Sequence, residues 1–303
     1  MQKCKVMNIF ILLVSMFCLC IVFKTVLYPS VQLPKFEDFQ RYEVEVHINS
    51  NRTNNYLLSK YYENICNSDK RKTEAIKEID FQAHTADYLR QLFHEFVMNP
   101  HRGRCAEKQR FGGQYIPTCK YWDGTKYICI SELLKDIQRQ QCIVYSFGIA
   151  NDWSFENTMD DIGCKVYAYD PTVKYPSHMG KNISFEQVGV SAHANIENSL
   201  ETLLSILHKN GHVDTKITYL KLDIEGHEVE GLGKWFESGA LDNVQQIGLE
   251  SHLSNNVELT LKFFETLRKL YFKANYRLIS YDLNACYRMW ANRYYDLAEI
   301  VLM

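Results

Sequence analysis

The sequence has no long run of lysine or arginine, and no stretch of helical pattern carries a basic face. Its 34 Lys and Arg residues are balanced by 36 Asp and Glu residues, which leaves a net charge of -2. Proteins that bind nucleic acid usually neutralise the phosphates with a concentrated positive charge. The composition therefore argues against nucleic acid as a main partner.

Other familiar patterns are missing as well. No cysteines stand in a C-x-x-C pair or in a Cys/His spacing that suits zinc, so a structural zinc site is not expected. Internal repeats and low-complexity segments are absent, which argues against a repeat or adhesive module. The G-x-G-x-x-G turn that holds the pyrophosphate of a dinucleotide is also absent. An NAD-type ligand is therefore not expected.

What the chain does have is an apolar N-terminal segment, which runs from Val6 to Phe23. About 18 such residues can span a bilayer, and the lysines that precede them favour a cytosolic N-terminus. No clear cleavage site follows, so we expect a single-pass, type II signal anchor rather than a signal peptide or a buried core helix. We predict a cytosolic tail over residues 1–5, the transmembrane anchor over 6–28, a stem over 29–80 and a lumenal domain over 81–303 that begins with an extension over 81–126.

The residues beyond the anchor suit the lumen of the ER or Golgi, or secretion if the anchor is cleaved. Glycosylation sequons occur at Asn51 and Asn182. An oxidising lumen allows disulfides. Seven cysteines lie in this region: Cys66, Cys105, Cys119, Cys129, Cys142, Cys164 and Cys286. Because seven is odd, at least one of them stays free or pairs between chains.

From Tyr127 onward, apolar segments of strand length alternate with segments of helical period. The expected strands are residues 143–148, 165–170, 183–190, 217–222, 244–249, 276–281 and 297–302. The expected helices are residues 88–97, 200–207, 229–236 and 259–270. This alternation predicts an α/β fold with a mostly parallel sheet and helices on both faces. The stretch 110–124 shows turn signals without a period, so we expect a loop there.

Polar residues fall where the predicted strands end. Asp170, Asp223 and Glu250 each follow an apolar run, and Gly148 ends another. The carboxyl ends of parallel strands share one rim, and ligands bind there in open α/β sheets. A glycine at such an end lets the backbone turn tightly and approach a ligand, and an acidic residue about 20 positions later usually accepts ribose hydroxyls. Without a phosphate-binding glycine pattern, the two predict a nucleoside ligand; the alternative for Asp170 is a turn residue before Pro171.

The segment from Leu220 to Glu228 holds the densest polar cluster, at a strand end followed by a helix start. Carboxylates in the first turn of a helix also serve as caps, which is the simpler explanation for Glu228. Capping does not easily explain Asp223 and Glu225 together. His252, near the end of the neighbouring strand, is a hypothetical general base or, alternatively, a surface loop histidine.

These segments resemble a known family. The runs 144–149, 151–156, 166–172 and 220–228 look like the methyltransferase-like protein 24 group and, more distantly, the FkbM-type methyltransferases. The stretches 110–113 and 123–126 resemble the part that precedes the fold in that group. The similarity extends over roughly Phe93 to Met303. It implies a Rossmann-like class I methyltransferase fold: a seven-stranded, mostly parallel sheet whose last strand is antiparallel.

The resemblance also implies S-adenosylmethionine as the cofactor and an oxygen acceptor, often on a sugar. By that analogy Ser146, Phe147 and Gly148 line the methionine side of the cofactor, Asp170 holds the ribose, and Asp223 lies near the sulfonium or the acceptor. Many class I enzymes carry an acidic residue and two glycines at the first strand, whereas this chain has Ser146 and one glycine.

A methyl transfer needs the acceptor in line with the methyl group and a base for the hydroxyl proton. Asp223, Glu225, Glu250 and His252 are the predicted catalytic residues, and no metal ligand is predicted. A carboxylate cluster that binds Mg²⁺ is the alternative mechanism. The alternative functions are a non-catalytic lumenal protein that keeps the fold and a metal-dependent glycosyltransferase, for which Asp223-Ile224-Glu225 is only an approximate motif.

Overall fold

The computed structural model describes residues 85–97, 105–174, 180–253, 257–286 and 297–303. All of them belong to one compact unit, Asn64–Met303. No helix in these ranges has the length and apolar character needed to cross a bilayer. The predicted tail, anchor and stem, the sequon at Asn51 and Cys66 lie outside the described residues, so those predictions remain predictions.

The largest sheet in the described ranges has seven strands in the order β12-β13-β11-β10-β5-β6-β7. Along the chain they are β5 (Ile143–Phe147), β6 (Lys165–Tyr169), β7 (Ile183–Glu186), β10 (Tyr219–Leu222), β11 (Ile247–His252), β12 (Leu278–Leu283) and β13 (Leu297–Leu302). Neighbours pair in parallel from β7 across to β11, whereas β13 is antiparallel to both β11 and β12. The predicted Rossmann-like α/β sheet with an antiparallel last strand is confirmed.

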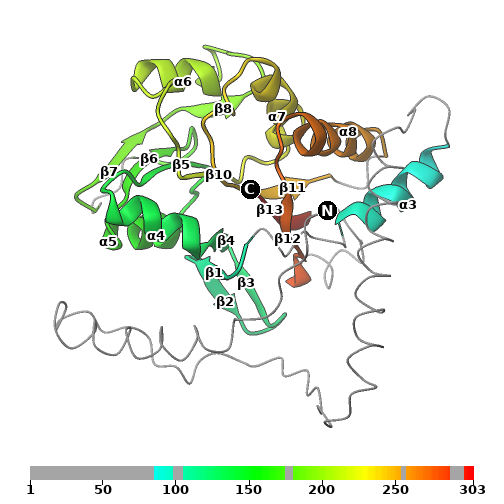
Figure 1. The fold of residues 1–303 in the computed structure, drawn as a ribbon, viewed down its shortest axis with the longest axis horizontal. Helices are drawn as coiled ribbons and strands as arrows, with labels where there is room; N and C mark the ends of the chain where they lie inside the picture. The colour runs from blue at the N-terminus through cyan, green and yellow to red at the C-terminus, as the bar shows by residue number, and fades with distance from the viewer. Residues whose placement is uncertain (1–84, 98–104, 175–179, 254–256, 287–296) are drawn as a thin grey trace, which may run out of the picture. The chain divides into compact units, whose positions relative to one another are not determined.

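Helices cover both faces of this sheet (Figure 1). One face packs against α3 (Ala86–Val97), α6 (Leu203–Lys209), α7 (His227–Glu237) and α8 (Val257–Lys273), and the other against α4 (Ile130–Gln138) and α5 (Ser154–Asp161). Successive strand residues point to opposite faces. Tyr145 and Phe147 therefore enter the first core, while Val144 enters the second.

The stretch predicted as a loop contains strands, so that prediction is wrong. β1 (Lys108–Phe111) pairs with β4 (Lys126–Cys129), and β2 (Gln114–Ile116) pairs with β3 (Tyr121–Asp123). All four strands have three or four residues. Most side chains of β1, β2 and β3 are exposed, whereas those of β4 are mostly buried. Short strands with mostly exposed side chains show no alternation of apolar and polar residues. The sequence pattern therefore does not reveal them.

Two strand boundaries also differ from expectation. The single strand predicted over 183–190 is divided into β7 and β8 (Gly189–Ser191), because β8 leaves the main sheet and pairs with β9 (Leu200–Thr202). The strand predicted over 244–249 begins later and continues to His252. Glu250 and His252 therefore lie within β11, held by its pairing with β13, and not on a loop.

Three disulfides join six of the seven cysteines that follow the predicted anchor. They are Cys105–Cys129, Cys119–Cys286 and Cys142–Cys164. The last of these ties the residue before β5 to the residue before β6, at the end of the sheet opposite the predicted rim. The second ties the β2–β3 hairpin to the segment after β12.

Candidate active site

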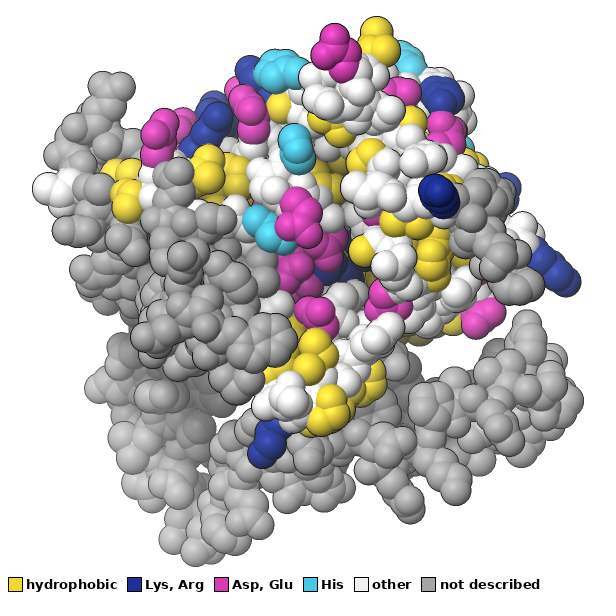
Figure 2. Space-filling model, turned by 180° about the vertical axis from the view of Figure 1, so that it is seen from behind, with side chains coloured by type: hydrophobic (Ala, Val, Ile, Leu, Met, Phe, Trp, Pro, Cys, Tyr) yellow, Lys and Arg dark blue, Asp and Glu magenta, His cyan; other side chains and the backbone are white. Residues whose placement is uncertain are grey.

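A cavity of about 640 Å³ opens at the carboxyl ends of β5, β6, β10 and β11. The β2–β3 hairpin supplies Gln114, Ile116 and Asp123 to its wall. Acidic and histidine side chains gather near the centre of the face shown in Figure 2. Six of the eight predicted site residues line the cavity: Phe147, Gly148, Asp170, Asp223, Glu225 and Glu250. Ser146 and His252 are not part of its lining.

Gly148 makes the turn that the sequence predicts, with φ of +79°. A β-carbon at this position would lie 1.7 Å from the carbonyl oxygen of Asp223, so no side chain fits. The backbone N–H of Asp223 in turn donates to the carbonyl of Phe147. Gly148 is therefore required because the loops after β5 and β10 touch, in addition to any approach by a ligand.

Asp170 organises the loop that follows β5. Its Oδ2 accepts hydrogen bonds from the backbone N–H groups of Ile149 at 2.8 Å and Ala150 at 2.9 Å, and its Oδ1 accepts from the N–H and hydroxyl of Thr172. Burial favours the neutral acid, but these four donors outweigh it and hold the pKa of Asp170 below its usual value. A carboxylate has about four acceptor positions. A ribose hydroxyl would have to share an oxygen with these donors, so the ribose role stays a prediction.

Ser146 lies beneath the rim and not in the cavity. It is completely buried on the α5 side of the sheet, and its hydroxyl donates to Oε1 of Glu156 at 2.5 Å. Lys221 reaches the same Glu156 oxygen at 3.3 Å and also donates to the carbonyl of Gly148. Ser146 and Lys221 thus share one buried acid of α5, Glu156, beneath the rim.

The turn between β10 and α7 is held by Glu228. Glu225 and Gly226 both have positive φ, and the completely buried Glu228 carboxylate accepts from the N–H of Gly226 at 2.9 Å and from the N–H of His252 at 2.7 Å. The capping explanation for Glu228 is confirmed. Because the same carboxylate also bonds the end of β11, it fixes Asp223 and Glu225 relative to that strand.

A buried lysine stands behind Asp223. Lys126 of β4 is fully enclosed, and its Nζ lies 2.7 Å from Oε1 of Glu299 in β13 and 3.4 Å from Oδ2 of Asp223. Burial opposes the charge on Lys126, but the surrounding carboxylates raise its pKa well above the usual value. Glu250 lies close by, and its Oε1 accepts from the amide of Asn284. The single positive charge of Lys126 therefore faces three carboxyl groups, those of Glu299, Asp223 and Glu250.

That imbalance sets the protonation of the carboxylates. Burial favours the neutral acid at Asp223, but the charge of Lys126 holds its pKa below the usual value. Burial and the charge of Asp223 raise the pKa of Glu250 to about 7. Burial and the neighbouring Glu250 and Asp223 raise that of Glu299 to about 8, against the pull of Lys126. Glu250 is thus the carboxylate whose pKa suits proton transfer near neutrality.

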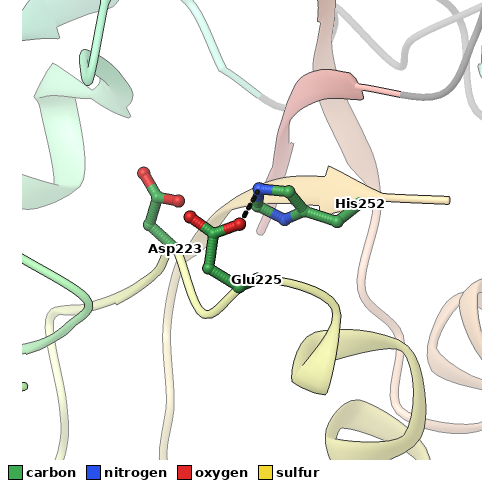
Figure 3. A group of neighbouring side chains, drawn as sticks. All are labelled: Asp223, Glu225 and His252. Atoms are coloured by element: carbon green, nitrogen blue, oxygen red, sulfur yellow. Dashed lines mark ion pairs between the residues drawn. The ribbon is translucent and has the colours of Figure 1, made fainter. Parts of the chain in front are cut away.

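His252 faces Glu225 across the mouth of this cluster. Figure 3 shows the Glu225 carboxylate, on the loop after β10, turned toward the imidazole ring at the end of β11, and the two lie 3.6 Å apart. Burial alone would lower the pKa of His252, but its contact with Glu228 and the charges of Glu250 and Asp223 raise it to about 9. At neutral pH the ring is an imidazolium, which cannot accept a proton.

The cluster also has the spacing of a cation site. Asp223, Glu225 and His252 each place one ligating atom within 4.8 Å of the others. Carboxylate and imidazole groups can bind divalent cations. The prediction of a site without a metal ligand therefore stays a prediction, with a cation at these three residues as its alternative.

Sequence reasoning missed Lys126, Glu156, Lys221 and Glu299 as parts of the site. Each is buried and ion-paired beneath the rim. A signal was available, because Lys126, Lys221 and Glu299 are single charges within otherwise apolar or aromatic strands. Lone charges in such strands are seldom buried without a partner.

Comparison with known proteins agrees with this geometry. A family model described as a methyltransferase domain matches residues 59–290. The chain is 27% identical over 183 residues to the protein named "Probable methyltransferase-like protein 24" from Homo sapiens and 28% identical over 183 residues to its Rattus norvegicus counterpart. Each alignment covers 54% of this chain and 48% of the relative, so the chain spans about half the length of the curated relatives it matches. No solved structure matches the chain significantly.

Proposed function

The chain belongs to this methyltransferase-domain family, and on that premise we propose that it transfers the methyl group of S-adenosylmethionine to a hydroxyl of a glycan or small molecule. One observation carries the proposal. A single cavity is lined by Gly148 and Asp170, expected at the nucleoside, and by Asp223 and Glu250, expected at the reacting atoms. This rim is where ligands bind in open α/β sheets.

The lining fits a cationic nucleoside better than a phosphorylated one. Acidic side chains predominate around the cavity: Asp123, Asp152, Asp170, Asp223, Glu225 and Glu250. Lys221 is the single lysine or arginine among the described residues that line it. Such a field repels the phosphates of a nucleotide sugar and attracts a sulfonium. Its volume also lies within the roughly 300–1,000 Å³ of small-molecule sites. When bound, S-adenosylmethionine supplies a methyl group that the sulfonium has made electrophilic.

Glu250 is the residue we assign to the hydroxyl proton. It lines the cavity, and its pKa of about 7 lets it accept a proton from the acceptor at neutral or slightly alkaline pH. Lys126 keeps the adjacent Asp223 ionised. Asp223 then serves as a fixed negative charge beside the acceptor, and positioning of the acceptor supplies much of the rate.

His252 takes a positioning role in this mechanism rather than the role of base. Its imidazolium lies between Glu228 at 3.2 Å and the carboxylates of Glu225 and Glu250 at 3.6 and 3.8 Å. It thereby anchors Glu225, whose side chain is 86% exposed at the mouth of the cavity. We assign Glu225 to the acceptor, as a carboxylate that can accept hydrogen bonds from sugar hydroxyls.

We further propose that the domain works in the lumen of the secretory pathway, held by the predicted N-terminal anchor. Two features support this location. The three disulfides are typical of an oxidising compartment. Asn182 of the second sequon is exposed, as glycosylation requires.

The test begins with calorimetric titration of the full-length chain with S-adenosylhomocysteine, followed by methyl transfer from labelled S-adenosylmethionine to a panel of neutral oligosaccharides. We expect micromolar binding and labelled product. Glu250→Gln should keep the binding within a few-fold and lose about 100-fold or more of the transfer rate. In the unaltered protein kcat/KM should rise with pH through about 7.

The control variant is Glu237→Gln, an exposed residue of α7 that is not part of the cavity lining, which should change neither measurement. Absence of binding by a folded chain would sink the proposal and favour a non-catalytic protein. Binding without transfer to any hydroxyl acceptor would support S-adenosylmethionine as the cofactor and contradict the assignment of an oxygen acceptor. Transfer that requires added Mg²⁺ would replace the imidazolium mechanism with the metal-dependent one.

A further inference from the structure

Lys221 is a cation in an otherwise acidic cavity. It lies in β10 with 5% of its side chain exposed, and it lines the cavity next to Gly148. An ammonium in this position is costly unless it is paired and hydrogen-bonded. Its place on the wall of the cavity therefore calls for a function.

Two protein acceptors hold the ammonium. Its Nζ donates to the carbonyl oxygen of Gly148 at 2.6 Å and to Oε1 of Glu156 at 3.3 Å. A lysine ammonium has three N–H donors. The described residues provide these two acceptors for Nζ. One N–H of the ammonium therefore remains for a molecule in the cavity.

Glu156 keeps the ammonium in place. It is completely buried, it also accepts the hydroxyl of Ser146, and its second oxygen has no hydrogen-bond partner among the described residues. A carboxylate with such incomplete hydrogen bonding persists in a core when a cation stabilises it. Lys221 is that cation, so the pair forms a rigid support beneath the rim.

The support lies beside the expected nucleoside position. The carbonyl of Gly148 bonds to Lys221, and the next two N–H groups along the same loop bond to Asp170. Asp170, the residue expected to bind ribose, thus contacts the loop after β5 at Ile149 and Ala150. The ammonium of Lys221 contacts it at the preceding residue, Gly148. A nucleoside with an amino-acid tail would place the tail at the end of the loop where Lys221 lies.

From these contacts we propose that Lys221 binds the α-carboxylate of the methionyl end of the cofactor, an assignment that rests on the proposed use of S-adenosylmethionine. The carboxylate accepts the remaining N–H of the ammonium in a charge-assisted hydrogen bond. The Ser146–Glu156 pair positions Lys221, so Ser146 would act on the methionine side through Lys221 and not by lining the cavity.

The experiment compares two ligands that differ only in the carboxylate. S-adenosylhomocysteine and its decarboxylated analogue, S-adenosyl-3-thiopropylamine, are titrated calorimetrically into the full-length chain. We expect the first to bind about tenfold more tightly or better. In Lys221→Met the preference should fall to within about twofold, because a neutral side chain cannot distinguish the two ligands.

Lys221→Met leaves Glu156 buried without its cation, so the double variant Lys221→Met/Glu156→Gln provides the same loss of charge without a stranded carboxylate. The matched control is Lys216→Met, which removes an ion-paired lysine that lies outside the cavity lining, before β10. It should keep the full preference.

The outcomes separate the two proposals. Equal binding of both ligands by the unaltered protein, or a preference that survives in a folded Lys221 variant, would overturn the role of Lys221 and leave the cofactor intact. Binding of neither ligand would overturn the proposed function, and the role of Lys221 with it.

Discussion

On the β6 side of the cavity, Asp170 is surrounded by N–H and O–H donors, whereas on the β11 side Glu250 lies among other carboxylates. Both carboxyl groups are buried at the end of a parallel strand. The pKa of Asp170 is lowered because four hydrogen bonds outweigh the effect of burial, and that of Glu250 is raised to about 7 by burial and by Asp223. Burial alone therefore does not decide whether a rim carboxylate is a permanent anion or a proton carrier; its nearest neighbours do.

This contrast matches the two tasks of the site. A permanent anion suits the recognition of ribose hydroxyls, and a group that titrates near neutrality suits proton transfer. Lys126 maintains the contrast on the β11 side, because it stabilises one charge among Asp223, Glu250 and Glu299 and leaves the others to hold protons.

The largest loss of stability is expected from Lys126→Met, which removes the cation from the carboxyl cluster on the β11 side of the cavity. Removal of one partner from a buried ion pair leaves an uncompensated charge and costs about 3–5 kcal/mol. The free energy of unfolding, measured with urea, should fall by that amount. The double variant Lys126→Met/Asp223→Asn should recover a large part, because it also removes the charge that the single variant leaves unpaired. A single variant as stable as the parent would show that Lys126 does not hold the cluster together.

A smaller effect is expected from Asp170→Asn on the β6 side. The amide has one acceptor oxygen and two donors of its own. Either the N–H groups of Ile149 and Ala150 or the N–H and hydroxyl of Thr172 therefore lose their acceptor, at a cost of about 1–3 kcal/mol. Because the folded-state pKa of Asp170 is lowered, its stabilisation is present above the unfolded pKa of about 3.9 and is lost as the pH falls through the folded value. The stability difference between parent and variant should therefore shrink in acid. A difference that does not change with pH would contradict the assigned charge.

The variant Thr172→Val tests whether Asp170 binds ribose directly. It removes the hydroxyl that donates to Oδ1 of Asp170 and leaves the three backbone donors in place. If Asp170 binds ribose, this variant should bind S-adenosylhomocysteine at least as tightly as the parent, while Asp170→Asn binds it more weakly. If both variants bind S-adenosylhomocysteine equally weakly, Asp170 affects binding only by holding the loop after β5 in place.

The last effect is expected in the pH dependence of stability, which Glu250→Gln should change. The folded-state pKa of Glu250 is raised, so its contribution is most favourable below the unfolded pKa of about 4.3 and is lost as the pH rises through about 7. Removal of this carboxyl group should make the decline in stability between pH 5 and 7 less steep, by up to about 1.4 kcal/mol per pH unit. Denaturation series at several pH values would measure the slope, and an unchanged slope would place the titration on another residue.

Much of the fold followed from the pattern of apolar residues. Strands β5, β6 and β10 and helices α3, α6, α7 and α8 carry an apolar pattern that could be recognised, whereas α4 and α5 were not predicted. Asp170, Asp223 and Glu250 were placed on one rim because parallel strands share an end. Strands β1, β2 and β3 were missed because strands of three or four mostly exposed residues carry no period. Cys142 and Cys164 were identified as disulfide candidates, but their pairing required the register of β5 and β6.

The sequence by itself determined the parallel sheet, the rim and the carboxylates on it, since these depend on local period and on which residue follows each strand. Only the tertiary structure decided what each carboxylate does. Lys126 and Glu299 are 173 positions apart in the chain and meet through strands that no local pattern connects. Ser146 and Phe147 are neighbours, yet one faces Glu156 and the other the cavity. Protonation and access depend on distances between side chains, and those distances exist only after the sheet has formed.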